Sequence, residues 1–86
     1  MSDHNPLLRE TILEVVDNQL RTGQPPETRQ TLDRLMAAGY SREEARSLIG
    51  AAVVTEIWRV LHEQQPYDEA RYVAALQRLP ELPDDE

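Results

Sequence analysis

The segment from residue 48 to residue 61 constrains the fold most, because it is apolar on almost every side of a helix. Only Thr55, Glu56 and Arg59 interrupt its run of apolar residues. A helix with so little polar surface has to be covered on several sides. We therefore expect a central helix that packs against several neighbours.

The ends of this central helix are marked in the sequence. Ser41 is followed three residues later by Glu44, which is the spacing of a capping box. The helix is predicted to begin there and to run to about Gln64, just before Pro66. One seam of the helix carries a glycine that would let another helix approach closely. The residues on this seam are Gly50, Val54, Ile57 and Leu61.

A first helix is predicted from residue 6 to residue 21. Asn5 can cap this helix, Pro6 suits its first position, and Gly23 can end it. Apolar residues recur at helical spacing on one face, and carboxylates on the opposite face are expected to be solvated. The apolar residues are Leu8, Ile12, Val15, Val16 and Leu20, and the carboxylates are Glu10, Glu14 and Asp17.

Two shorter helices complete the predicted fold. Pro26 can open one that ends at Gly39, and its narrow apolar stripe places it on the surface of its neighbours. Asp68 can cap another that runs to about Leu79. The inward-facing residues are expected to be Leu32, Leu35 and Met36 in the former and Tyr72, Val73, Leu76 and Leu79 in the latter.

The sequence thus predicts an all-α fold, a compact bundle of three main helices plus a short fourth C-terminal helix. No alternation of apolar and polar residues is long enough to indicate a strand. Residues 1–79 are expected to form a single helical domain. Residues 80–86 carry two prolines and four carboxylates, and we expect them to be an acidic flexible tail.

Composition excludes several classes of function. The chain has no cysteine and no lysine, which rules out a disulfide framework, a thiol nucleophile and a P-loop lysine. The net charge of −7 and the scattering of nine arginines along the chain disfavour nucleic-acid binding. No apolar run approaches the roughly 18 residues of a membrane span. We therefore expect a cytoplasmic protein with neither nucleic acid nor membrane as its partner.

Few side chains could carry catalysis. His62 lies in the last turn of the central helix, four residues after Trp58, so the two rings can touch. Glu56 and Glu63 are expected on a solvated face of that helix, and His4 precedes the first helix. With no readable catalytic or cofactor motif, we expect no enzyme, no cofactor and no metal site. The alternative is a small metal-binding or enzymatic protein that uses His62 with Glu63 or another nearby carboxylate.

Trp58 is the most informative side chain for a binding role. Tryptophan is enriched at binding hot spots, and the central helix has more apolar surface than three small neighbours readily cover. The sequence therefore predicts a protein-interaction or self-association module. Its partner would be a second copy, docked along the central helix, or another protein. The anchors would be Val54, Trp58 and Leu61.

Residues 35–45 carry a local resemblance to a known fold. They read Leu-Met-Ala-Ala-Gly-Tyr-Ser-Arg-Glu-Glu-Ala. This run resembles the first loop and second helix of ubiquitin-associated domains, whose Met-Gly-Phe/Tyr loop contacts ubiquitin. The resemblance implies that Gly39 and Tyr40 could contact a ubiquitin-like partner, with Ala38 in place of the usual methionine.

A second resemblance extends over nearly the whole chain. It is carried by Asn5-Pro6-Leu7-Leu8, Gln19 with Gln24-Pro25-Pro26, Glu56-Ile57-Trp58, and Asp68-Glu69 with Tyr72. These motifs are similar to those of an uncharacterised bacterial domain-of-unknown-function family of small helical proteins. In that family, histidines four residues apart on the first and third helices imply a metal or polar site. The corresponding residues of this chain are Arg9, Leu13, Glu43 and Ser47.

Overall fold

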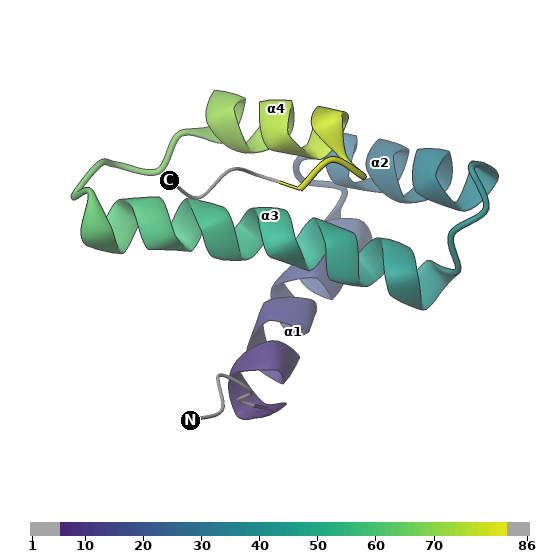
Figure 1. The fold of residues 1–86 in the computed structure, drawn as a ribbon, viewed down its shortest axis with the longest axis horizontal. Helices are drawn as coiled ribbons and strands as arrows, with labels where there is room; N and C mark the ends of the chain where they lie inside the picture. The colour runs from purple at the N-terminus through teal and green to yellow at the C-terminus, as the bar shows by residue number, and fades with distance from the viewer. Residues whose placement is uncertain (1–5, 83–86) are drawn as a thin grey trace.

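The longest helix, α3, spans Arg42–His62 and runs through the middle of the fold (Figure 1). The computed structural model describes residues 6–82 of the chain. Ser41 caps α3 with the predicted capping box: its Oγ accepts from the Glu44 amide at 3.0 Å, and its own amide donates to Glu44 Oε1 at 2.9 Å. The helix ends two residues before the predicted Gln64, because Gln64 adopts a left-handed φ of 53°.

Three further helices pack against α3, and the described residues contain no strand. They are α1 (Pro6–Thr22), α2 (Pro26–Ala37) and α4 (Glu69–Arg78). Gly23 and Gly39 follow α1 and α2 with φ of 72° and 109°, which is the conformation that ends helices at glycine. Asp68 Oδ1 accepts from the Arg71 amide at 3.3 Å and caps α4 as predicted. The all-α prediction is therefore confirmed, whereas the proposed Asn5 cap lies outside the described residues.

The helices α2 and α4 lie along one side of α3, and α1 crosses α3 at a steep angle (Figure 1). Gly50 is at this crossing, because a Cβ placed on it would lie 3.3 Å from Ile12 Cγ2 and 3.9 Å from Leu13 Cδ2. The close helix approach expected at Gly50 is thus present. The rest of its predicted seam is not covered, since Val54, Ile57 and Leu61 are exposed.

All four helices contribute to one hydrophobic core. Its members from α1 and α2 are Ile12, Val16, Leu20, Leu32 and Leu35; those from α3 and the α4 segment are Ala45, Ile49, Ala52, Val53, Tyr72, Leu76 and Leu79. Three inward predictions were wrong or incomplete. Leu8 and Met36 are exposed, and Val73 is only half-buried. The N-terminal end of α1 extends past α3 (Figure 1), and Leu8 in its first turn is 55% exposed.

The buried face of α2 is wider than its apolar pattern indicated. Thr28 and Thr31 are buried beside Leu32 and Leu35, so α2 contributes more than a surface stripe. The same helix also stabilises the end of α4. Arg34 donates to the carbonyl oxygens of Leu79 at 2.7 Å and Leu76 at 2.9 Å. Basic side chains near a helix C-terminus satisfy carbonyl groups that have no partner within the helix.

Candidate functional site

Four large apolar side chains form an exposed row on α3, which we call the α3 stripe. They are Val54, Ile57, Trp58 and Leu61, with exposed fractions of 46%, 41%, 38% and 69%. Side chains three and four residues apart share one face of a helix, so the row is continuous. The stripe contains the three predicted anchors and adds Ile57. Its role in binding stays a prediction.

The stripe is exposed because of the direction in which α1 crosses α3. Their contact includes Gly50, while α2 and α4 occupy the other side of α3 (Figure 1). The C-terminal half of α3 therefore has no helix over the stripe. Contiguous apolar surface of this kind is characteristic of interaction sites.

A groove lies next to the stripe and shares Ile57 and Leu61 with it. We call it the α1–α3 groove; its volume is about 350 Å³. Val15 of α1 and Tyr67 of the loop before α4 form its sides. The remaining lining residues are Gln19, Val53, Glu56, Val60 and Tyr72. Partial burial and the negative charges of Glu69, Glu56 and Asp68 raise the pKa of the Tyr67 hydroxyl above its ordinary value.

Trp58 is held in place by His62. Their rings stack with centroids 4.7 Å apart and planes 22° apart, which confirms the predicted contact. Glu63 pairs with Arg59 at 3.5 Å. Among residues 6–82, no group of three histidine, cysteine or acidic side chains lies close enough to hold a metal. The alternative role for His62 and Glu63 thus has no further ligand around it in the described part of the chain.

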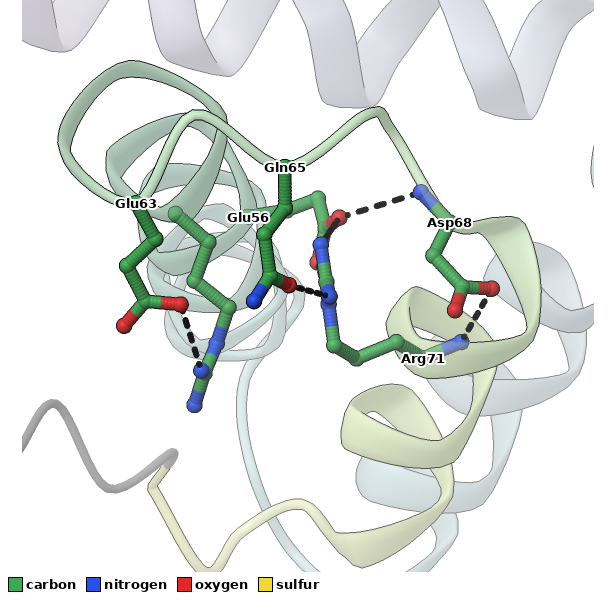
Figure 2. A network of polar contacts seen from close by, with 6 residues as sticks. Glu56, Glu63, Gln65, Asp68 and Arg71 are labelled. Atoms are coloured by element: carbon green, nitrogen blue, oxygen red, sulfur yellow. Dashed lines mark hydrogen bonds and ion pairs between the residues drawn. The ribbon is translucent and has the colours of Figure 1, made fainter.

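Glu56 was expected on a solvated face, and that expectation was wrong. It is 6% exposed and forms a bidentate ion pair with Arg71 of α4 (Figure 2). Arg71 Nε donates to Glu56 Oε1 at 3.0 Å, and Arg71 Nη2 donates to Glu56 Oε2 at 2.5 Å. The Asp68 amide donates to Glu56 Oε2 at 3.2 Å, and Arg71 donates to Gln65 Oε1 at 2.7 Å. Glu56 therefore fixes the loop between α3 and α4.

The same contacts set the charge of Glu56. The hydrogen bonds from the Arg71 side chain hold the pKa of this carboxyl below its ordinary value, although burial opposes them. Glu56 is consequently ionised and neutralised by Arg71 at neutral pH. Glu56 lines the α1–α3 groove, but because Arg71 neutralises its carboxylate, the pair adds no net charge there.

A second polar cluster lies between α1, α2 and α4. Gln19 Oε1 accepts from the Thr28 hydroxyl at 2.7 Å and from the Tyr72 hydroxyl at 2.8 Å. Thr28 and Tyr72 are buried, so their hydroxyl groups need this acceptor. Burial raises the pKa of the Tyr72 hydroxyl to about 12.

We expect the protein to lose stability in alkali through Tyr72. The hydroxyl ionises near 10 in the unfolded chain and at about 12 in the fold, so the unfolded state gains stability first as the pH rises. At about pH 11 the loss is about 1.4 kcal/mol relative to neutral pH. Urea unfolding at the two pH values measures it. The Tyr72→Phe variant should show a smaller alkaline loss; an equal loss would contradict this assignment.

The residues singled out by the two resemblances occupy other surfaces. Tyr40 is half-buried and packs against the core, while Gly39 is exposed. Their contact with a ubiquitin-like partner stays a prediction. Where the second resemblance implies histidines, the chain has a polar contact between helices, since Arg9 Nη2 donates to Ser47 Oγ at 3.3 Å.

The fold and its exposed stripe define a small all-helical domain with an exposed apolar face. Residues 1–78 match the family described as a domain of unknown function, DUF1841. The chain belongs to that family, in agreement with the resemblance that its helical motifs carry. No curated protein and no solved structure matches the sequence. None of the helices within residues 6–82 is both long and apolar enough to cross a bilayer.

Proposed function

We propose that this domain works by self-association, with the α3 stripe as its interface. The observation that carries the proposal is the row of four exposed large apolar side chains beside an apolar groove. In a two-fold dimer the same face of both copies is buried, which is the commonest symmetry of oligomers. Trp58 and Leu61 would be the central anchors.

The charges around the stripe favour this use. The four stripe residues are uncharged, and the two charged residues between them in the sequence are paired: Glu56 with Arg71, and Arg59 with Glu63. Docking another molecule on the stripe therefore leaves Glu56 and Arg59 with their partners, so that neither becomes a buried unpaired charge, which is costly. The same pairing leaves these carboxylates poorly suited to proton transfer. The proposal is a binding role without catalysis.

Sedimentation equilibrium of the wild type and two variants tests the proposal. We expect a dimer at tens of micromolar, and we expect Trp58→Ala and Leu61→Ser each to weaken it by about 30-fold or more, because truncating a hot spot costs about 2 kcal/mol. Met36→Ser is the control, since Met36 is a similarly exposed apolar residue of α2, outside the stripe. It should leave the dimer intact.

The two stripe variants should also fold normally, since both side chains are exposed. Far-ultraviolet circular dichroism verifies this. A wild type that stays monomeric at the highest concentrations measured contradicts self-association. Dimers of equal strength in Leu61→Ser and wild type contradict the choice of interface.

A further inference from the structure

A hollow on another face of the molecule gathers four of the nine arginines of this acidic chain. Arg21, Arg29, Arg42 and Arg46 line it, and its volume is about 700 Å³. It forms where the C-terminal part of α1, the first half of α2 and the N-terminus of α3 meet. We call it the arginine pocket. None of its lining residues belongs to the α3 stripe, so it is independent of the proposed dimer.

Two of these arginines have no partner in the described chain. Among residues 6–82, the guanidinium groups of Arg29 and Arg42 make no hydrogen bond or ion pair, whereas Arg34 and Arg71 are fully engaged. Arg46 pairs with Asp17 at 3.0 and 2.9 Å, and Arg21 donates to the side chain of Asn18. The pocket thus holds two guanidinium groups whose donors are available to a ligand.

The balance of charge in the pocket is positive. Its four arginines are opposed by two carboxylates, Asp17 and Glu43. Ser41 and Arg42 also place the N-terminus of the 21-residue α3 at the pocket, and that end of a helix carries partial positive charge. The pocket is therefore a local site of opposite sign to the net charge of −7.

We propose that the arginine pocket binds a phosphate group, either as free phosphate or pyrophosphate or as part of a small phosphorylated molecule. Guanidinium groups match phosphate oxygens with two parallel hydrogen bonds, and several converging arginines favour a multiply charged anion. The volume lies within the roughly 300–1,000 Å³ of small-molecule sites.

The negative net charge of the chain limits the size of the ligand. Charges are screened over about 8 Å at physiological ionic strength. A small anion in the pocket is therefore attracted by the arginines more strongly than it is repelled by the distant carboxylates. A long polyanion would extend over surface that repels it. The pocket therefore fits a small phosphorylated ligand better than a nucleic acid.

Titration of the ¹⁵N-labelled protein with pyrophosphate at low ionic strength tests the site. We expect saturable shifts at the amides of Ser41, Arg42 and Glu43. The double variant Arg29→Gln/Arg42→Gln should weaken binding by about 100-fold or more, because each lost charge-assisted hydrogen bond weakens binding by about tenfold or more. Both side chains are exposed and unpaired, so the variant should keep the wild-type thermal midpoint.

Arg78→Gln is the matched control. Like each half of the double variant, it removes one positive charge, here from an exposed position of α4 outside the pocket, where Arg78 pairs with Glu81 at 3.6 Å. Its affinity should equal that of the wild type. Glu43→Gln should instead raise the affinity, since it removes a carboxylate from the pocket. A gain of this kind cannot come from a damaged fold.

Parallel titrations with inorganic phosphate and a sugar phosphate show whether the pocket binds the free anion or the phosphate group of a larger molecule. Tighter binding of the ester indicates a phosphorylated molecule whose organic part contacts the pocket, whereas equal or tighter binding of the inorganic anions indicates the free ion. The proposal is overturned if no anion gives saturable shifts at the α3 N-terminus. It is equally overturned if Arg78→Gln weakens binding as much as the double variant does.

Discussion

Replacing Gly50 by leucine is expected to lower the free energy of unfolding by about 3 kcal/mol, because the new side chain would occupy the crossing of α1 and α3. A Cβ alone would already lie 3.3 Å from Ile12 Cγ2, and the further atoms of leucine would meet α1 directly. For a chain of this size the loss corresponds to about 15 °C in the thermal midpoint. Calorimetry measures both quantities.

Gly50→Ala is the control for this prediction. Its single Cβ meets only the flexible side chains of Ile12 and Leu13, which can move by a few tenths of an ångström. Alanine also gains about 1 kcal/mol of helix propensity over glycine, so the two effects should nearly cancel. A leucine variant as stable as the alanine variant would contradict a close helix crossing at this position.

Replacing Glu56 by alanine is expected to cost about 2–3 kcal/mol of unfolding free energy. Removing one member of a buried ion pair leaves the other without compensation, a loss of about 3–5 kcal/mol when both are fully buried. Here Arg71 can turn partly toward water, since its side chain is 27% exposed, so we expect less than the full cost. The Asp68 amide also loses its acceptor. Urea unfolding at neutral pH measures the effect.

Two comparisons show whether the stability lost in Glu56→Ala comes from the broken ion pair or from the loss of side-chain packing. The double variant Glu56→Leu/Arg71→Leu should recover most of the lost stability, because an apolar pair of similar volume leaves no uncompensated charge. Acid should also reduce the difference between wild type and Glu56→Ala. The pKa of Glu56 is lowered in the fold from 4.5, so its contribution is complete above that pH and disappears as the pH falls through the folded-state value. A difference that stays constant in acid would contradict the ion pair.

The helices could be predicted from the sequence because their ends are encoded locally. Ser41 with Glu44, Asp68, Gly23 and Gly39 each act on backbone groups within a few residues, so spacing alone identifies them. The central place of α3 followed from its apolar surface. Helix α3 ends two residues earlier than predicted because Gln64 adopts a left-handed conformation, and nothing in the sequence indicates that conformation.

The candidate site was only partly predictable. The excess of apolar surface on residues 48–61 indicated an uncovered face, but not that α1 would cross at Gly50 and leave that face open beyond it. Contacts between distant residues had no local signal. Glu56 and Arg71 are 15 residues apart, and the four arginines of the pocket are scattered over three helices. From the sequence alone, charged residues at such positions are expected on a solvated helix face, and only the fold shows which of them lie close together.

Helix α4 depends on its neighbours for its existence. Its 10 residues are fewer than the roughly 12–15 that an isolated helix needs in water. Near the N-terminus of α4, Arg71 forms an ion pair with Glu56 of α3. At the C-terminus of the helix, Arg34 of α2 donates hydrogen bonds to the carbonyl groups. Opening α2 would therefore remove the donor that closes α4. The two helices should exchange their amide hydrogens with solvent as one cooperative unit, although 31 residues separate the end of the first from the start of the second.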